Sequence, residues 1–319
     1  MKDFSEAASL TPIAALASFA QDPMYRFLSL SPWLVASVLA AGTEQAKPPA
    51  GRIVSYPEFA SRYVASREVD VWLPPGYDEA PGARFPVIYM QDGQNLFDPS
   101  KSYAGRAWEV DKAMERLISA GRTRGAIIVG IWNTGRTRSA EYMPAKAFTT
   151  RDVKDVANGY GPESHPIISD LYLKFMVQEL KPFIDATFRT QPDAAHTFVM
   201  GSSIGGLISA YAVAEYPQVF GAAACLSTHW PAGNGAVIDY LRDHLPDPGT
   251  HRFYFDHGTE TLDSQYAPFQ DRMDEIMKAR GYREGVSWTT RVFPGAEHSE
   301  ASWSKRVEIP LGFLLGIQG

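Results

Sequence analysis

Hydrophobic and polar positions form two kinds of pattern, which alternate from about residue 53 to the end of the chain. Residues 85–90 and 126–131 are continuous apolar runs, typical of strands buried on both faces. Residues 62–73 instead alternate between apolar and polar side chains, which predicts an antiparallel strand ending at the prolines that follow. Further strand-like runs lie at 197–200, 220–226, 252–256 and 286–293.

Segments with helical spacing separate these runs. Residues 108–120 repeat apolar side chains every three or four positions, and Gly121 follows as a stop. Residues 170–188 carry one apolar face, and Pro182 is expected to kink or shorten that helix near its end. Other helices are predicted at 204–215, 236–244 and 268–280 and after residue 298. This alternation predicts an α/β fold with a mainly parallel central sheet and helices on both faces.

The chain divides into an N-terminal extension, residues 1–50, and one domain, residues 51–319. A hydrophobic content of 45% in 319 residues is enough for a single large core. Residues 47–51 have the composition of a linker. Residues 133–166 form a long polar stretch that breaks the strand–helix rhythm, and we expect it to lie on the substrate side of the domain.

The extension contains an apolar segment, residues 27–42, that is too short to predict a stable membrane span. If translation starts at Met24, Arg26 supplies the positive charge of a secretory signal, and residues 24–42 predict a secreted or periplasmic protein. A start at Met1 places acidic residues ahead of the apolar segment. The segment is then expected to be an amphipathic helix or a disordered extension, and the protein to be cytoplasmic.

Composition excludes several classes of function. The net charge is −6 and the basic residues are scattered, which argues against a nucleic-acid partner. Cys225 is the only cysteine, so no intrachain disulfide or cysteine-based metal site can form, and its apolar surroundings predict a buried thiol. Metal, Walker and dinucleotide motifs are absent from the sequence, so no metal or cofactor is expected.

The segment Gly201-Ser202-Ser203-Ile204-Gly205 has the pattern G-x-S-x-G, directly after a predicted strand and directly before a predicted helix. This context is typical of a nucleophile elbow, with Ser203 on the strained turn and Ser202 as a neighbour that points elsewhere. The backbone amide of Ile204 would donate to a developing oxyanion. A glycine-rich turn without chemistry is the alternative interpretation.

A serine nucleophile needs a base and an acid, which follow it along the chain in this fold in the order acid, then histidine. His298 comes after the last predicted strand, where the base is expected. The acid should follow the strand at 252–256, where Glu260 and Asp263 both qualify. We favour Glu260 because it lies nearer the end of the predicted strand, with Asp263 as the alternative.

A second oxyanion donor is expected in the loop after the strand at 85–90. The backbone amide of Gln94 is the candidate, with Asn95 beside it. The residues that could line a substrate cleft are Asn95, Trp108, Asn133, Arg138 and His229. Each of these is also consistent with simple packing or a surface ion pair.

Five strings of this sequence resemble a known family: Leu73-Pro74-Pro75-Gly76-Tyr77, Asp92-Gly93-Gln94-Asn95-Leu96-Phe97, Arg138-Ser139-Ala140-Glu141-Tyr142-Met143-Pro144, Met200-Gly201-Ser202-Ser203-Ile204-Gly205-Gly206 and Gly295-Ala296-Glu297-His298. They are similar to the "putative esterase" family, which contains esterase D (S-formylglutathione hydrolase), siderophore esterases, and feruloyl and acetylxylan esterases. The resemblance implies an α/β-hydrolase fold, no cofactor, and hydrolysis of a small-molecule or glycan-linked ester. It also implies Ser203 as nucleophile, His298 as base and the loop near Gln94 as part of the oxyanion hole.

One departure from the family concerns the acid. Several members have an aspartate soon after a Gly-Thr pair, where this chain has Gly258-Thr259-Glu260. The functional prediction is therefore ester hydrolysis through an acyl-enzyme on Ser203. An acyltransferase with the same residues and a hydrolase-fold binding protein without turnover are the alternatives.

Overall fold

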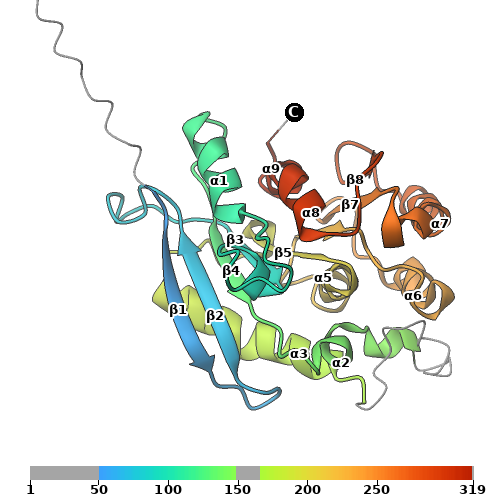
Figure 1. Ribbon diagram of the computed structural model, residues 1–319, viewed down its shortest axis with the longest axis horizontal. Coiled ribbons are helices and arrows are strands. Elements are labelled where there is room, and N and C mark those ends of the chain that lie inside the picture. Colours follow the sequence, from blue (N-terminus) through green and yellow to red (C-terminus); the bar gives the residue numbers. More distant parts are fainter. Residues whose placement is uncertain (1–49, 149–165, 318–319) are drawn as a thin grey trace, which may run out of the picture. The chain divides into compact units, whose positions relative to one another are not determined.

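The central element is a twisted sheet flanked by helices (Figure 1). The computed structural model describes residues 50–148 and 166–317. Within them the strand order is β1-β2-β4-β3-β5-β6-β7-β8. The strands are β1 (Arg52–Phe59), β2 (Arg67–Leu73), β3 (Val87–Gln91), β4 (Ile127–Ile131), β5 (Thr197–Ser202), β6 (Ala222–Leu226), β7 (Arg252–Gly258) and β8 (Trp288–Phe293). Strands β1 and β2 are antiparallel to their neighbours, and all other pairs are parallel.

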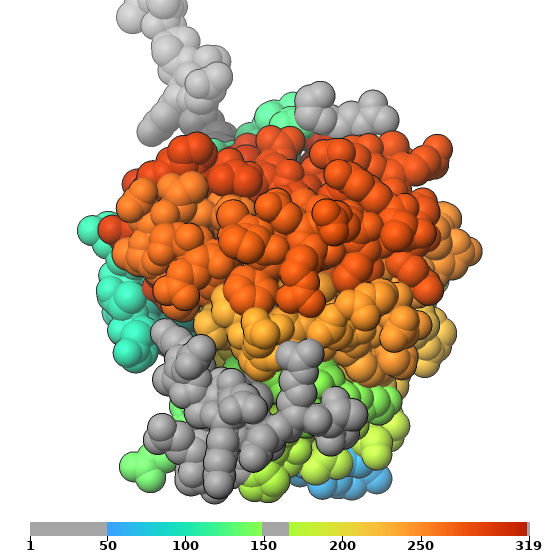
Figure 2. All heavy atoms as spheres, turned by 90° about the vertical axis from the view of Figure 1, so that its right-hand side faces the viewer, coloured from blue at the N-terminus to red at the C-terminus, as the bar shows by residue number. Residues whose placement is uncertain are grey.

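Helices cover both faces of the sheet, so the predicted α/β-hydrolase fold class is confirmed. They are α1 (Val110–Ser119), α2 (Arg138–Tyr142), α3 (Ser169–Phe175), α4 (Lys181–Thr187), α5 (Ile204–Glu215), α6 (Ala236–His244), α7 (Ala267–Ala279), α8 (Glu300–Arg306) and α9 (Glu308–Leu314). Short 3-10 helices include η1 (Gly93–Asn95), η2 (Ala145–Phe148) and η7 (Thr261–Gln265). Figure 2 shows the side of the molecule on which α6, α7 and β8 lie. The C-terminal part of the chain, yellow to red, forms most of this face.

The strands form two hydrophobic cores because successive side chains point to opposite faces of a sheet. In β3, Tyr89 joins the core on the α3, α5 and α6 side, whereas Ile88 and Met90 join the core on the α1, α8 and α9 side. Cys225 on β6 is buried in the first core as a free thiol, as its apolar surroundings predicted. Burial raises the pKa of this thiol well above its ordinary value.

Two predicted elements differ from the structure. The strand expected at 62–73 begins only at Arg67, and the edge strand β1 precedes it. Pro57 lies in β1, and a proline is tolerated in a sheet only at an edge, so local pattern disfavoured a strand there. The helix expected at 170–188 is divided into α3, the π-helical turn η4 (Met176–Leu180) and α4. Pro182 follows that turn in the first turn of α4, where a missing backbone N–H costs least.

Several predictions concern residues outside the described ranges. The extension, the signal-like segment and most of the linker precede residue 50. Of the polar stretch at 133–166, the described part contains α2 and η2, and residues 149–165 lie outside. No helix in the ranges 50–148 and 166–317 is long and apolar enough to cross a membrane.

Candidate active site

Ser203 lies at a sharp turn between β5 and α5. Its backbone has φ 58° and ψ −127°, a left-handed φ that is strained for a residue with a side chain. A Cβ atom added at Gly201 would lie 2.6 Å from the carbonyl oxygen of Gly205. Glycine is therefore required at position 201, because the strand and the helix approach too closely for a side chain. The geometry of the G-x-S-x-G segment is that of the expected elbow.

The amide of Ile204 opens α5, and an amide in the first turn of a helix has no partner within that helix. Ser202, the neighbouring serine, is the last residue of β5 and pairs in register with Leu226 on β6. The amide of Ser203 donates to the carbonyl of Leu226 at 3.0 Å. The elbow is thus tied to the adjacent strand, and the amide of Gly206 in the first turn of α5 donates back to the Ser203 carbonyl at 3.0 Å.

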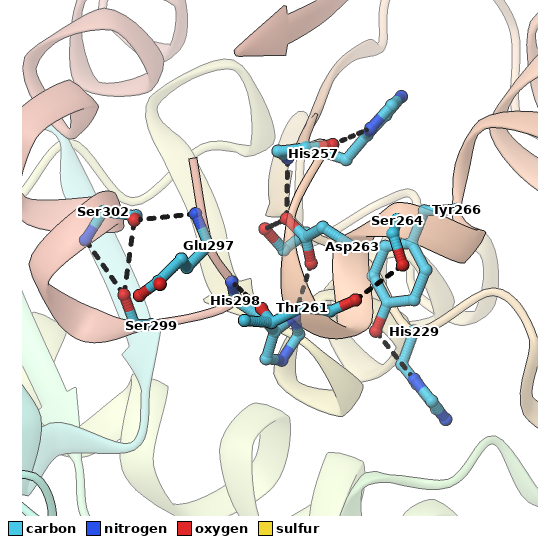
Figure 3. Close-up of polar contacts among 12 residues, drawn as sticks. His229, His257, Thr261, Asp263, Ser264, Tyr266, Glu297, His298, Ser299 and Ser302 are labelled. Carbon is cyan, nitrogen blue, oxygen red and sulfur yellow. Dashed lines mark hydrogen bonds and ion pairs between the residues drawn. The ribbon is translucent and has the colours of Figure 1, made fainter. Parts of the chain in front are cut away.

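His298 and Asp263 form a close pair at the ends of β8 and β7 (Figure 3). Nδ1 of His298 lies 2.6 Å from Oδ1 of Asp263, whose side chain is fully buried. The other oxygen, Oδ2, accepts hydrogen bonds from the Ser227 hydroxyl and the Gly258 amide, both at 2.6 Å. Burial alone would raise the pKa of Asp263, but hydrogen bonds from His298 and Ser227 outweigh it and hold the pKa below its ordinary value.

The contact of His298 is therefore with Asp263 rather than with Glu260, the residue favoured from the sequence. Strand β7 runs two residues beyond its expected end, to Gly258, so Glu260 only begins the turn that follows. Glu260 is exposed and its carboxylate accepts from the Thr259 hydroxyl at 3.3 Å. One turn later, Asp263 faces inward.

Aromatic rings surround His298 and connect it to His229. The rings of Tyr266 and Trp303 lie edge-on to the imidazole, at centroid distances of 5.8 and 5.0 Å. Nδ1 of His229 lies 2.8 Å from the Tyr266 hydroxyl, and the His229 amide donates to the Ser203 carbonyl at 3.1 Å. Burial, reinforced by the charges of His298 and Arg138, lowers the pKa of His229 to about 4. His229 is therefore neutral at neutral pH.

The loop after β3 carries the predicted second oxyanion donor, Gln94, and a buried aspartate anchors it. Asp92 accepts two parallel hydrogen bonds from Arg138, Nε to Oδ1 and Nη2 to Oδ2, both at 2.7 Å. The side-chain Nδ2 of Asn133 donates to the same carboxylate at 2.7 Å, and the backbone amide of Asn133 donates to Oε1 of Gln94 at 3.2 Å. Arg138 and Asn133, predicted as cleft residues, thus hold this loop.

Two further residues of α2 complete the anchor. The Tyr142 hydroxyl accepts from the Asp92 amide at 3.3 Å. Glu141 forms a buried, two-pronged ion pair with Arg67 of β2, with both hydrogen bonds at 2.8 Å. The short helix α2 is therefore fixed to the sheet on one side and to the Asp92 loop on the other.

Most of the chain matches one known family. The model of the "Putative esterase" family matches residues 61–308. The chain belongs to this family. It is accordingly a carboxylic ester hydrolase, and the family resemblance drawn from its motifs is confirmed.

Individual relatives of the esterase are distant. Protein YbbA of Bacillus subtilis is 24% identical over 257 residues, which cover 79% of this chain and 93% of the relative. Among solved structures, a ferulic acid esterase has a TM-score of 0.63 at 18% identity, covering 84% of this chain and all of that one. An IroE-like serine hydrolase from Shewanella oneidensis has a TM-score of 0.65 at 20% identity, covering 83% and 80%. At these identities the structures show a shared fold.

The remaining cleft candidates of the esterase have structural contacts. Trp108 is buried and packs on Trp303, with ring centroids 5.4 Å apart. Because Trp303 also packs against His298, Trp108 lies in the core one ring removed from the imidazole. Asn95 is buried as well, and its side-chain Oδ1 accepts from the Ser102 hydroxyl and the Tyr103 backbone amide at 3.2 and 3.0 Å. Asn95 thereby holds the loop that follows η1.

Sequence reasoning missed the residues that support these groups: Asp92, Glu141, Tyr142, Ser227, Asp256, Trp303 and Arg306. Glu141 and Tyr142 lie in one of the strings shared with the family and Asp92 begins another, which was the available signal. Ser227 and Asp256 carried no comparable signal, because their partners lie far away in the sequence. Within the described ranges, no cluster of three or more histidine, cysteine or acidic side chains could hold a metal ion.

Proposed function

We propose that the esterase cleaves its substrate through an acyl-enzyme on Ser203, with His298 as general base and Asp263 as the acid that orients it. The 2.6 Å contact between His298 Nδ1 and Asp263 Oδ1 carries this proposal. A carboxylate on Nδ1 fixes the tautomer in which Nε2 is free to accept a proton. The strained backbone of Ser203, at the tip of the elbow, supports its role as nucleophile.

In the first step, Nε2 of His298 takes the proton of the Ser203 hydroxyl while Oγ bonds to the carbonyl carbon. The carbonyl π electrons move to its oxygen, which the amides of Ile204 and Gln94 stabilise. The C–O bond to the alcohol then breaks, and the imidazolium protonates the leaving alcohol. Water, deprotonated by the same imidazole, then attacks the acyl carbon. The bond from that carbon to Oγ breaks, the imidazolium returns its proton to Oγ, and the carboxylic acid is released.

The proposed substrate is a small-molecule or glycan-linked carboxylic ester. Similarity in fold to a ferulic acid esterase supports the inclusion of feruloyl esters in a substrate screen. The bent backbone at Asp92 (φ 57°) and the close packing of Gly93 on β4 support Gln94 as a fixed second donor. A Cβ atom added at Gly93 would lie 2.6 Å from the backbone of Gly130.

Hydrolysis of p-nitrophenyl acetate by the wild type and by Ser203→Ala tests the nucleophile. We expect kcat to fall about 10,000-fold or more in the variant, because the covalent route is lost. Circular dichroism controls for folding, and Ser202→Ala is the matched control because it removes a hydroxyl one residue away. Equal rates for wild type and Ser203→Ala would refute the proposal. Product analysis with an added alcohol separates hydrolysis from acyl transfer.

A further inference from the structure

Ser227 lies directly after β6 and has three side-chain partners. Its Oγ is 2.6 Å from Oδ2 of Asp263, 2.9 Å from Nε1 of Trp303 and 2.9 Å from Nη2 of Arg306. The residue is fully buried, and its φ of 40° is left-handed. A buried non-glycine residue in that conformation is held there by its surroundings.

The chemistry of the partners fixes the direction of each hydrogen bond. An indole N–H and a guanidinium N–H can only donate, so Trp303 and Arg306 both donate to the Ser227 oxygen. A hydroxyl has two lone pairs and one proton, so its acceptor capacity is filled and its proton goes to the third partner. Ser227 therefore donates to Asp263 and cannot turn to accept a proton from it.

Arg306 is itself fixed from behind by a buried aspartate. Its Nε and Nη2 donate to Oδ2 and Oδ1 of Asp256 at 3.2 and 2.9 Å, and both side chains are almost fully buried. The backbone amide of Ser227 donates to the Asp256 backbone carbonyl at 2.8 Å and to the Asp256 Oδ1 at 3.2 Å, and the Tyr254 hydroxyl donates to Oδ2 at 3.0 Å. Asp256 thus holds the backbone of Ser227 directly and its hydroxyl through Arg306.

We propose that Ser227 is a positioning residue of the active site: its hydroxyl, locked as a donor by Trp303 and Arg306, fixes the Asp263 carboxylate and through it the imidazole of His298. This inference rests on the proposed roles of Asp263 and His298. Both oxygens of Asp263 are then committed, one to His298 and the other to Ser227 and the Gly258 amide. The carboxylate cannot rotate without breaking a hydrogen bond.

Trp303 joins the two halves of this arrangement. Its indole N–H donates to Ser227, and the same ring packs edge-on against His298 at 5.0 Å. The helix α8 begins two residues after His298. It therefore supplies the ring that packs against the imidazole, Trp303, and both donors to the Ser227 hydroxyl, Trp303 and Arg306. Loss of the Ser227 hydroxyl should loosen the acid and the base together.

Ser227→Ala and Ser227→Gly test the inference with Ser287→Ala as control. Alanine removes the hydroxyl, and glycine removes it while relieving the left-handed φ, so the pair separates chemistry from strain. Ser287 is also buried, and its hydroxyl accepts from the Arg283 backbone amide at 2.9 Å, just before β8 and thus at the opposite end of that strand from His298. We expect kcat for p-nitrophenyl acetate to fall roughly tenfold or more in both Ser227 variants, with KM unchanged, because a hydrogen bond to a charged group is lost.

The second measurement is the downfield proton resonance of the His298 Nδ1–H group, assigned by its absence in His298→Asn. It is recorded on the resting protein, so it does not depend on turnover. We expect it to move or to be lost by exchange in both Ser227 variants and to stay in place in Ser287→Ala. A wild-type resonance in both Ser227 variants would overturn the inference. If Ser203→Ala kept full activity, the proposed function would fail, and this resonance would still decide whether Ser227 holds the Asp263–His298 pair.

Discussion

The Asp263 carboxylate shows how single residues are tuned at this site. It is buried, which favours the neutral acid, yet three donors hold it in the charged form. Glu260, three residues earlier, is exposed and does not meet the imidazole. The two acidic residues that follow β7 therefore have different expected roles.

Asp263→Asn and Glu260→Gln form a matched pair that checks this difference. We expect Asp263→Asn to lower kcat about 1,000- to 10,000-fold, because an amide favours the wrong imidazole tautomer. Glu260→Gln should stay within about twofold of the wild type, because an exposed side chain is replaced by one of the same shape. Steady-state hydrolysis of p-nitrophenyl acetate measures both, and a larger loss in Glu260→Gln would assign the acid to Glu260.

His229 makes stability depend on pH. Its pKa in the folded protein is about 4, below the ordinary value near 6.5, so the unfolded chain binds the proton more readily. Stability should therefore fall as the pH decreases from about 6.5 to 4, by up to about 3 kcal/mol from this group. Urea unfolding at pH 7 and pH 4.5 should show a smaller acid loss in His229→Gln than in the wild type. An equal loss in both would contradict the expected contribution.

At the scale of elements, the five-residue helix α2 depends on its contacts. A helix this short is not stable alone in water, so its ion pairs and packing must hold it. Glu141 ties it to Arg67 in β2, and Arg138 and Tyr142 tie it to Asp92. The helix α2 thereby fixes the position of the Gln94 loop relative to the sheet.

Arg138→Lys tests this support, with Arg136→Lys as control on an exposed neighbour. Lysine keeps the charge but loses the parallel pair of hydrogen bonds to Asp92, so we expect kcat to fall about 10- to 100-fold. The control should match the wild type. Arg138→Lys with wild-type kcat would show that the loop keeps its geometry without the paired contact.

Local sequence pattern was sufficient for some elements and not for others. Continuous apolar runs predict the buried parallel strands, and a glycine-rich turn predicts the start of α5. The expected fold class followed from these patterns. The choice between Glu260 and Asp263 depended on where β7 ends, and boundaries are the least certain part of such predictions. The Arg138–Asp92 and Ser227–Arg306 contacts join residues 46 and 79 positions apart, which no local periodicity encodes.

At the scale of the whole molecule, the site collects the carboxyl ends of five strands. Asp92, Ser203, Ser227, Asp263 and His298 follow β3, β5, β6, β7 and β8 respectively. These parallel strands all end at the same edge of the sheet, which is where open α/β sheets bind ligands. The geometry of the site therefore depends on the integrity of the sheet.

The single cysteine reports that integrity. Cys225 is fully buried on β6, and burial raises the pKa of its thiol, so little reactive thiolate is available in the folded protein. We expect dithiobis(nitrobenzoate) to label the native protein far more slowly than the unfolded chain. Labelling across a urea series should follow the loss of circular dichroism. Fast labelling in native buffer would show that β6 opens locally without global unfolding.

The placement of Trp303 and Arg306 on the helix after His298 has a consequence for exchanging parts between relatives. Nine consecutive residues, 298–306, contain the proposed base, the indole beside it and the guanidinium that orients Ser227. Chimeras with a junction inside this segment would combine a base from one parent with supports from another, at a helical register set by the first. Junctions placed before residue 298 or after residue 306 transfer the segment intact, together with its dependence on the recipient's Ser227 and Asp256.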